Sequence, residues 1–231
     1  MAAEVELKLS IAPTAVAHVR RHPAVARVAG GSVSTTRLVS TYFDTPRWEL
    51  FESGLALRLR RSGRRWLQTV KSEGSQLAGL TTRPEFEWAL GAPRIDATKL
   101  AETPWRDRFE ATARRIKPRF VTDFLRTAQP LAFPQGTRAS LCVDTGEIRA
   151  GRKRAPIAEI EIEIVEGDAG PIFELALALA ADLPLAIEHR SKAERGYALL
   201  RPQLPEPVRA KTVDLAPDSS APAAIFSVAI R

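Results

Sequence analysis

The sequence predicts an α+β protein built on an eight-stranded antiparallel β-barrel, a tunnel, with helices packed outside it. Eight segments carry the period-2 alternation or the β-branched composition that is typical of strands. Most of them follow one another across short turns, as the strands of hairpins do. Eight strands in hairpin order suit a closed or nearly closed antiparallel barrel. The eight segments are residues 4–8, 34–43, 55–60, 65–71, 80–90, 120–127, 139–148 and 158–166.

The first of these strands has one apolar and one charged face. Val5 and Leu7 share a face, and Glu4, Glu6 and Lys8 share the other. Similar charged faces recur in four further strands, as Glu159, Glu161 and Glu163 opposite Ile160, Ile162 and Ile164, as Arg83, Glu85 and Glu87, as Arg58 and Arg60, and as Lys71. If helices cover the apolar faces from outside, the charged faces must point into the barrel.

The remaining elements are predicted around these strands. Gly170-Pro171 starts a helix, since proline is favoured in the first helical turn. Pro84 indicates that its strand lies at an edge, contains a bulge, or begins after the proline. The predicted helices are residues 14–21, 98–102, 108–115, 172–181 and 193–200, and residues 185–187 form a short extended piece.

Composition limits the class of protein. The 231 residues suit one sizeable domain with or without an appendage, and 45% hydrophobic with 26% charged residues is ordinary for a globular protein. The formal net charge of +7 suggests a polyanionic partner. Cys142, the single cysteine, allows no internal disulfide, and no apolar run is long enough to span a bilayer. A cytoplasmic, reducing setting fits these features.

Inward-facing carboxylates would repel one another unless cations compensate them. Mg²⁺ or Mn²⁺ suits carboxylate and phosphate oxygens, and arginine forks pair with phosphate. The basic side chains available for this are Lys8, Arg58, Arg60, Lys71, Arg83, Arg126 and Lys192. A chamber lined with both acids and bases suits a metal–oligophosphate complex. The alternation also suits a sheet whose polar faces are simply exposed to water, and this alternative stays open.

Seven motifs resemble the CYTH domains of the triphosphate tunnel metalloenzymes. They occur in the family's order and span nearly the whole folded part of the chain. The motifs are Glu4-Val-Glu-Leu-Lys8, Tyr42-Phe43-Asp44-Thr45, Leu57-Arg58-Leu59-Arg60, Thr69-Val70-Lys71, Arg83-Pro-Glu85-Phe-Glu87, Glu159-Ile-Glu161-Ile-Glu163, and Ser191-Lys192 with Arg195-Gly196-Tyr197. One such motif would be a weak signal, because any amphipathic strand can produce it.

The resemblance implies roles for individual residues. It implies metal binding by Glu4, Glu6, Glu159 and Glu161, with Glu85 and Glu87 nearby and with Glu163 and Asp144 as further candidates. It implies phosphate binding by the seven basic residues, Lys8, Arg58, Arg60, Lys71, Arg83, Arg126 and Lys192. Glu4, Glu6, Lys8, Arg58 and Lys71 are the residues that we expect to be essential for catalysis.

The resemblance also implies an activity, the metal-dependent hydrolysis of inorganic triphosphate to pyrophosphate and phosphate by direct attack of water. Thiamine triphosphatase and adenylate cyclase are rival activities within the family. A non-catalytic polyphosphate-binding module is the alternative from another class. A nucleic-acid binder is disfavoured, because only 6% of the residues are aromatic and the bases interleave with acids.

Two regions are predicted along the chain. Residues 1–202 form the CYTH-like domain, and residues 203–231 form a tail rich in proline and alanine. Residues 210–215 and 223–230 resemble the junction between a CYTH domain and a following helical CHAD domain, which suggests either a longer chain that contains a CHAD domain or a chain that has lost one. The alternative is a tail that is unrelated to any partner domain.

Overall fold

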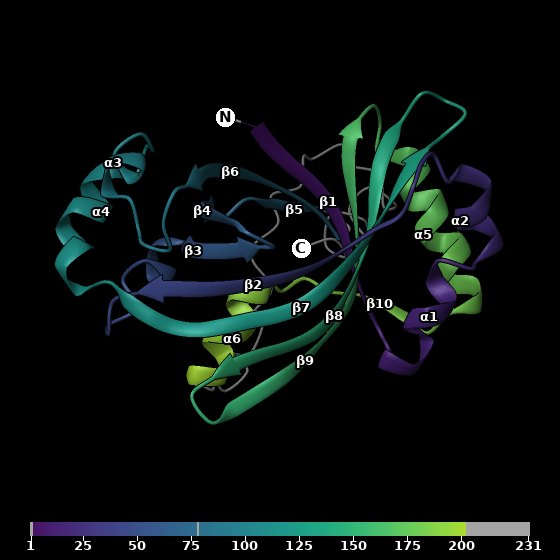
Figure 1. The fold of residues 1–231 in the computed structure, drawn as a ribbon. Coiled ribbons are helices and arrows are strands. Elements are labelled where there is room, and N and C mark those ends of the chain that lie inside the picture. The colour runs from purple at the N-terminus through teal and green to yellow at the C-terminus, as the bar shows by residue number, and fades with distance from the viewer. Residues whose placement is uncertain (1, 78, 202–231) are drawn as a thin grey trace, which may run out of the picture. The chain divides into compact units, whose positions relative to one another are not determined.

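The computed structural model describes residues 2–77 and 79–201, and its core is a closed antiparallel barrel (Figure 1). The strands that form it are β1 (Ala2–Ile11), β2 (Ser34–Asp44), β3 (Leu55–Ser62), β4 (Arg65–Ser72), β6 (Leu80–Leu90), β7 (Lys117–Ala132), β8 (Arg138–Ala150) and β9 (Lys153–Glu166). They neighbour one another in the order β1-β9-β8-β7-β2-β3-β4-β6, and pairing of β1 with β6 closes the ring. The predicted eight-stranded antiparallel barrel is therefore confirmed.

Two short strands extend the barrel beside its closure. β10 (Leu185–Ile187) pairs with the end of β1, and β5 (Ser75–Leu77) pairs with the start of β6. On one side of β6, the ladder with β5 ends at Thr82 and the ladder with β4 begins at Glu85. Arg83 and Pro84 therefore belong to neither of these two ladders. A proline is tolerated there because it interrupts no pairing on that side. β6 nevertheless runs through Pro84, and the alternative that the strand begins after the proline is wrong.

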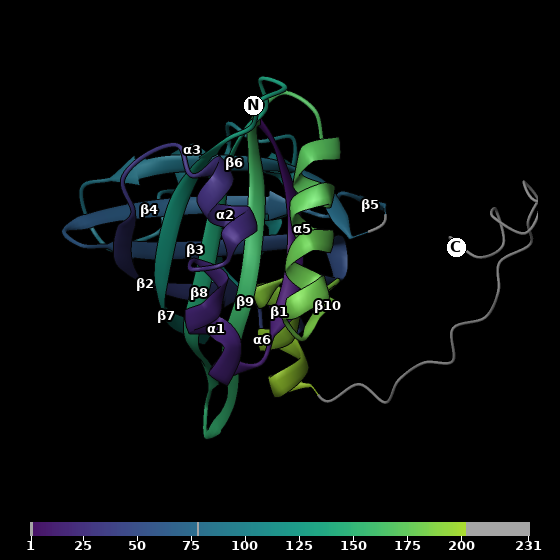
Figure 2. The ribbon, with the colours of Figure 1, turned by 90° about the vertical axis from the view of Figure 1, so that its right-hand side faces the viewer.

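Five helices lie outside the barrel. α1 (Val16–Val19), α2 (Pro23–Val28) and α5 (Gly170–Asp182) cover the face formed by β1, β8 and β9 (Figure 2). α3 (Ala97–Leu100) and α4 (Arg106–Thr112) form the second group, and their buried Leu100 and Phe109 pack against the apolar face of β3 and β4. The segment predicted at residues 14–21 is broken into a 3₁₀ turn at Pro13–Ala15 and α1. α2 was not predicted; the His22 ring accepts a hydrogen bond from the amide of Ala24 at its start.

The last helix, α6 (Lys192–Leu200), packs against the inner face of the barrel, which differs from the outside position expected for all helices. Its Ala193 and Tyr197 join a cluster with Tyr42 and Phe120, which are cross-strand partners on β2 and β7. A Cβ at Gly196 would lie 2.2 Å from the Phe120 ring, so only glycine allows this close approach. The charged N-terminal turn of α6 is therefore placed inside the barrel.

None of the helices in residues 2–77 and 79–201 is long and apolar enough to cross a membrane. The predicted tail and its resemblance to a CHAD junction lie outside the described residues.

Candidate functional site

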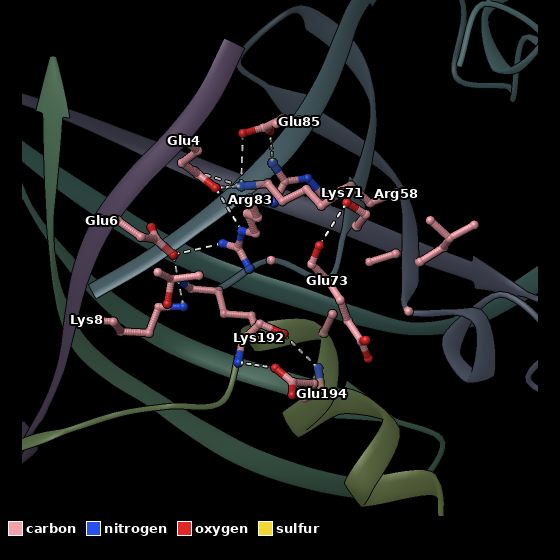
Figure 3. A pocket seen from close by; sticks show the side chains of 18 of the residues that line it. Glu4, Glu6, Lys8, Arg58, Lys71, Glu73, Arg83, Glu85, Lys192 and Glu194 are labelled. Carbon is pink, nitrogen blue, oxygen red and sulfur yellow. Dashed lines mark hydrogen bonds and ion pairs between the residues drawn. The ribbon is translucent and has the colours of Figure 1, made fainter. Parts of the chain in front are cut away.

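The inner faces of the strands enclose a cavity of about 890 Å³ (Figure 3). Its lining includes nearly every residue that the sequence singled out, namely Glu4, Glu6, Lys8, Arg58, Arg60, Lys71, Arg83, Glu85, Glu87, Arg126, Glu161, Glu163 and Lys192. Asp144 and Glu159 are fully buried and do not line it. Several lining charges are almost inaccessible to water, with Glu6 only 2% exposed. The alternative of a water-exposed polar sheet face is therefore wrong.

One wall of the cavity is built by β1, β4 and β6. Lys71 Nζ donates to both oxygens of Glu4, at 2.8 and 2.6 Å. Arg83 Nε donates to Glu4 Oε2 at 2.9 Å, and its Nη2 donates to Glu6 Oε1 at 2.8 Å. Burial by itself raises the pKa of Glu4, but the charges of Lys71 and Arg83 outweigh it and lower that pKa to about 2. Arg83 reaches these carboxylates because it is the direct cross-strand partner of Glu4.

The adjoining wall comes from β3, β4 and β6. Lys71 and Glu85 are cross-strand partners and form an ion pair at 3.0 Å. Arg58 lies 3.5 Å from Glu85 and 4.0 Å from Glu87, and Thr69 Oγ1 donates to Glu87 at 3.0 Å. The buried Nε of Arg58 has no hydrogen-bond partner. A donor of this kind is costly to bury and suits an oxygen of an anionic ligand.

Arg60 is a cation without a carboxylate partner among the described residues. Its Nε donates to Ser40 Oγ at 3.1 Å. Burial and the positive charges of Arg58 and Arg126 lower its pKa to about 10. Burial and the charges of Arg83 and Arg58 also lower the pKa of Lys71. These shifts show that positive charge is crowded on this side, and an anion bound there would relieve the repulsion.

Glu163 is the opposite case, a carboxylate without an ion-pair partner in the part of the chain that the structure describes. It is half-buried and lies directly across from Glu6 in the β1–β9 ladder. Burial and the negative charges of Glu4 and Glu6 raise its pKa. Glu6 Oε2 also has no partner in the described chain, although Glu6 Oε1 contacts Arg83 and Lys8. This set of oxygens fits a divalent cation, which prefers carboxylate ligands and would relieve the repulsion.

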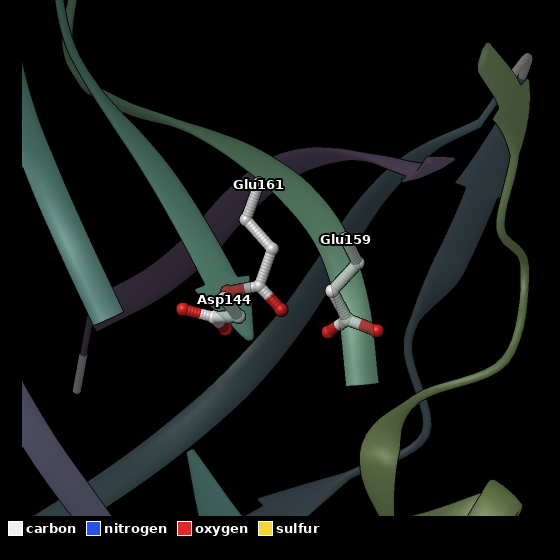
Figure 4. Close-up of side chains that lie close together, drawn as sticks. All are labelled: Asp144, Glu159 and Glu161. Carbon is white, nitrogen blue, oxygen red and sulfur yellow. The ribbon is translucent and has the colours of Figure 1, made fainter. Parts of the chain in front are cut away.

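A second group of carboxylates lies deeper, on β8 and β9. Asp144, Glu159 and Glu161 each offer an oxygen, and these three oxygens lie within 4.8 Å of one another (Figure 4). Asp144 and Glu159 are cross-strand partners and are completely buried. Spacing alone would allow this group, which we call the carboxylate trio, to hold a metal ion. Lys192 and Arg126 also reach into the trio.

Two contacts at α6 were not predicted from the sequence. Arg195 Nη1 donates to Glu159 Oε2 at 2.6 Å. The signal for this contact was its spacing, because Arg195 follows Lys192 by three residues and so lies on the same helical face. Asp44 accepts hydrogen bonds from the amides of residues 45, 50 and 51 and from the Tyr197 hydroxyl, at 3.0 Å for the last. It thereby ties the loop after β2 to α6.

The fold and the site define a closed antiparallel barrel whose cavity is lined by interleaved acids and bases. The CYTH domain family matches residues 2–197, and the chain belongs to that family, within the triphosphate tunnel metalloenzymes. The inorganic triphosphatase of Haemophilus influenzae is 29% identical over 202 residues, which cover 86% of this chain and 55% of that protein. The chain thus spans about half the length of this relative.

Solved structures share the fold. A putative adenylyl cyclase from Hippeastrum, described as having a dominant triphosphatase activity, superposes with a TM-score of 0.59 at 18% identity, covering 84% of this chain and 95% of that one. A putative adenylate cyclase from Bacillus halodurans superposes with a TM-score of 0.51 at 17% identity, covering 84% and 98%. At these identities the likeness concerns the barrel alone.

Proposed function

We propose that this chain is a metal-dependent inorganic triphosphatase, which hydrolyses tripolyphosphate to pyrophosphate and phosphate. The observation that carries the proposal is the presence, in one cavity, of a cation and a carboxylate that each form no ion pair with the residues that the structure describes. Arg60 suits a phosphate oxygen, and Glu163 with Glu6 suits a divalent metal ion. The inorganic triphosphatase of Haemophilus influenzae, to which the chain is similar, supports the same activity.

The ion pairs on the cavity wall formed by β1, β4 and β6 are suited to opening when triphosphate and a metal ion bind. Glu4 and Glu6 hold Lys71, Arg83 and Lys8 in place before substrate arrives. Glu4, Glu6 and Glu163 would hold Mg²⁺ or Mn²⁺, which would supply neutralisation of phosphate charge and activation of a water. Lys71, Arg83 and Lys8 can donate to phosphate oxygens, since their Nζ and guanidinium groups line the same cavity.

The phosphate-binding residues then serve the hydrolysis itself. Water attacks the terminal phosphorus, the bond from that phosphorus to the bridging oxygen breaks, and pyrophosphate leaves with the electron pair. Arg58, Arg60 and Arg126 lie where their guanidinium groups can neutralise the oxygens of the chain. Positioning and charge neutralisation supply most of the catalysis in phosphoryl transfer. Glu4, Glu6, Lys8, Arg58 and Lys71 are accordingly the residues that we assign to catalysis.

Phosphate release from tripolyphosphate, ATP and thiamine triphosphate tests this proposal, with Mg²⁺, with Mn²⁺ and with EDTA. We expect metal-dependent turnover of tripolyphosphate well above that of the other two. The variant Glu6→Gln keeps the side-chain shape and should lower kcat/KM at least about a hundredfold. Glu110→Gln is its matched control, because Glu110 is exposed on α4, away from the cavity, and pairs with Arg106 on the same helix.

The other outcomes identify the rival functions. Preferred turnover of thiamine triphosphate, or release of pyrophosphate from ATP with cyclic AMP, would replace tripolyphosphate as the substrate. Tight tripolyphosphate binding without turnover of any substrate would make the chain a polyphosphate-binding module.

A further inference from the structure

Every oxygen of the carboxylate trio already faces a cationic side chain. Asp144 accepts both arms of the Arg126 guanidinium, at 2.8 and 2.7 Å, and its Oδ2 also lies 2.7 Å from Lys192 Nζ. Glu159 pairs through one oxygen with Lys192 and through the other with Arg195, at 2.6 Å. Glu161 pairs through one oxygen with Lys192, at 2.9 Å, and through the other with Arg126.

The Lys192 ammonium lies at the centre of this arrangement. It lies within ion-pair distance of one oxygen from each of the three carboxylates and donates a hydrogen bond to Glu161 Oε1 at 2.9 Å, whereas the buried Glu159 Oε1 accepts no hydrogen bond. Burial by itself lowers the pKa of Lys192, but the charges of Asp144, Glu161 and Glu159 outweigh it and raise that pKa above the ordinary value. The ammonium therefore stays charged at neutral pH and occupies the position that a metal ion would take.

The negative charges of the trio are fully compensated. Its three carboxylates, Asp144, Glu159 and Glu161, face Lys192, Arg126 and Arg195, and a fourth cation, Lys8, lies 3.7 Å from Glu161. A divalent ion added to this group, in which Asp144 and Glu159 are completely buried, would add uncompensated positive charge in a region of low dielectric constant, which is strongly unfavourable. Within the described chain, in contrast, Glu163 forms no ion pair and Glu6 Oε2 accepts no hydrogen bond, and the pKa of Glu163 is raised although Lys71 and Arg126 act against the rise. The donor set of the trio therefore does not fit a metal ion in this protein, whereas the set around Glu163 does.

We propose that Lys192 is the permanent cation of the carboxylate trio, so that Asp144 and Glu159 anchor α6 inside the barrel and do not bind metal. The anchoring role stands on the ion pairs alone. The statement that metal binds at Glu4, Glu6 and Glu163 instead rests on the proposed function. Lys192 is then a positioning residue for the cavity wall.

Mn²⁺ binding, followed by electron paramagnetic resonance without substrate, separates the two groups of carboxylates. Glu159→Gln should leave Mn²⁺ affinity within about twofold of the wild type, whereas Glu163→Gln should lower it by more than about tenfold. Glu166→Gln is the matched control on β9, because Glu166 is exposed and pairs with Arg138 outside the cavity. A tenfold loss of affinity in Glu159→Gln would overturn the proposal.

Removal of the ammonium provides the opposite test. Lys192→Met frees one oxygen on each carboxylate, so we expect one additional Mn²⁺ site per chain. Lys192→Arg should restore the wild-type stoichiometry, since it returns a cation. A Lys192→Met protein that is folded, as shown by a cooperative unfolding transition, and that gains no Mn²⁺ site would contradict the proposal. If Lys192→Met does not fold, the Mn²⁺ affinity of Glu159→Gln decides instead.

Hydrogen exchange tests the anchor independently of metal. In EDTA, the amides of α6 should exchange at least about tenfold faster in Glu159→Gln than in Glu166→Gln, while the amides of α5 remain unchanged. Unchanged exchange in α6 would refute the anchoring role. Wild-type protein that binds no Mn²⁺ and hydrolyses no tripolyphosphate would instead refute the proposed function, and the exchange result would still decide the role of Lys192.

Discussion

α5 and α6 pack against opposite faces of the same strand, β9. Ile172, Leu175 and Leu179 of α5 join a cluster with Ile160 and Ile162, on the outer face. On the inner face, Lys192 and Arg195 of α6 pair with Glu159 of the same strand, and Figure 4 shows that carboxylate beside Glu161. One strand thus supports an apolar interface on one side and an ionic interface on the other.

The difference shows what each interface can do. The α5 interface buries apolar side chains, which stabilise the barrel and need no particular partner. The α6 interface buries charges, which are stable only when each has a partner of opposite sign. Substitutions on the outer face should therefore change stability, whereas substitutions in the cavity should change binding and catalysis. Four predictions test this contrast, in order of decreasing expected effect.

The largest effect is expected from a cation of the cavity. Arg58→Ala should lower kcat/KM for tripolyphosphate by on the order of 10²–10³, because it removes a donor that stabilises phosphate charge. The melting temperature should change little in comparison. Steady-state kinetics and thermal unfolding measure the two quantities, with Arg106→Ala on the exposed surface of α4 as the control. An unchanged rate in Arg58→Ala would remove this residue from the site.

A substitution at the outer interface, between α5 and the barrel, should lower stability and leave catalysis unchanged. Leu179 is 0% exposed beneath α5, and Leu179→Ala should lower the free energy of unfolding by about 2–5 kcal/mol. Urea denaturation measures this loss, and kcat per folded molecule should stay constant. Leu177→Ala on the same helix is the matched control, because Leu177 is 73% exposed and should change stability by less than about 0.5 kcal/mol. Equal losses in the two variants would contradict the packing of α5.

Acid should weaken the ionic side of the barrel. The pKa of Glu4 falls from 4.5 to about 2 on folding, so the unfolded chain binds its proton more tightly. The resulting stability, on the order of 3 kcal/mol, is complete above pH about 4.5 and is lost as the pH falls towards 2. Urea unfolding in EDTA between pH 5 and pH 2 should therefore have a shallower pH dependence in Glu4→Gln. Glu163→Gln is the contrasting control, because the pKa of Glu163 is raised and its charge is unfavourable in the fold.

The smallest effect concerns the hydroxyl that fastens α6. Tyr197→Phe removes the hydrogen bond to Asp44 and should cost about 1 kcal/mol, since Asp44 keeps three backbone donors. The phenylalanine ring can still stack on Phe51. Hydrogen exchange should detect the loss in α6 and not in α5. Equal acceleration in both helices would indicate a general loss of stability instead.

The two helices also show how far the sequence could predict this molecule. The helix predicted at residues 172–181 is α5, and the one predicted at 193–200 is α6, each within two residues at either end. Both were expected outside the barrel. Periodicity identifies a helix but not the face of the sheet against which it packs, and only the contact of Gly196 with Phe120 places α6 inside.

The short elements were the least predictable. β5 has three residues and α2 has six, which is too short for a hydrophobic period to be recognised. Pro84 had three interpretations from sequence, because the position of a proline relative to neighbouring ladders depends on strands that are distant in the chain. The structure chose between these interpretations, because Pro84 lies within β6 at the gap between its ladder with β5 and its ladder with β4.

The sequence by itself determined the strands of the barrel and which side chains share a face of each strand, whereas the structure showed that the charged faces point into the cavity. The sequence could do so because a period of two residues assigns each side chain of a strand to one face. Only the tertiary structure decided how acids and bases pair across strands. Among the described residues Glu163 forms no ion pair and Glu159 pairs with two cations, although both lie on the same face of β9. The difference arises because α6, which is distant in sequence, brings its cations to one end of that face alone.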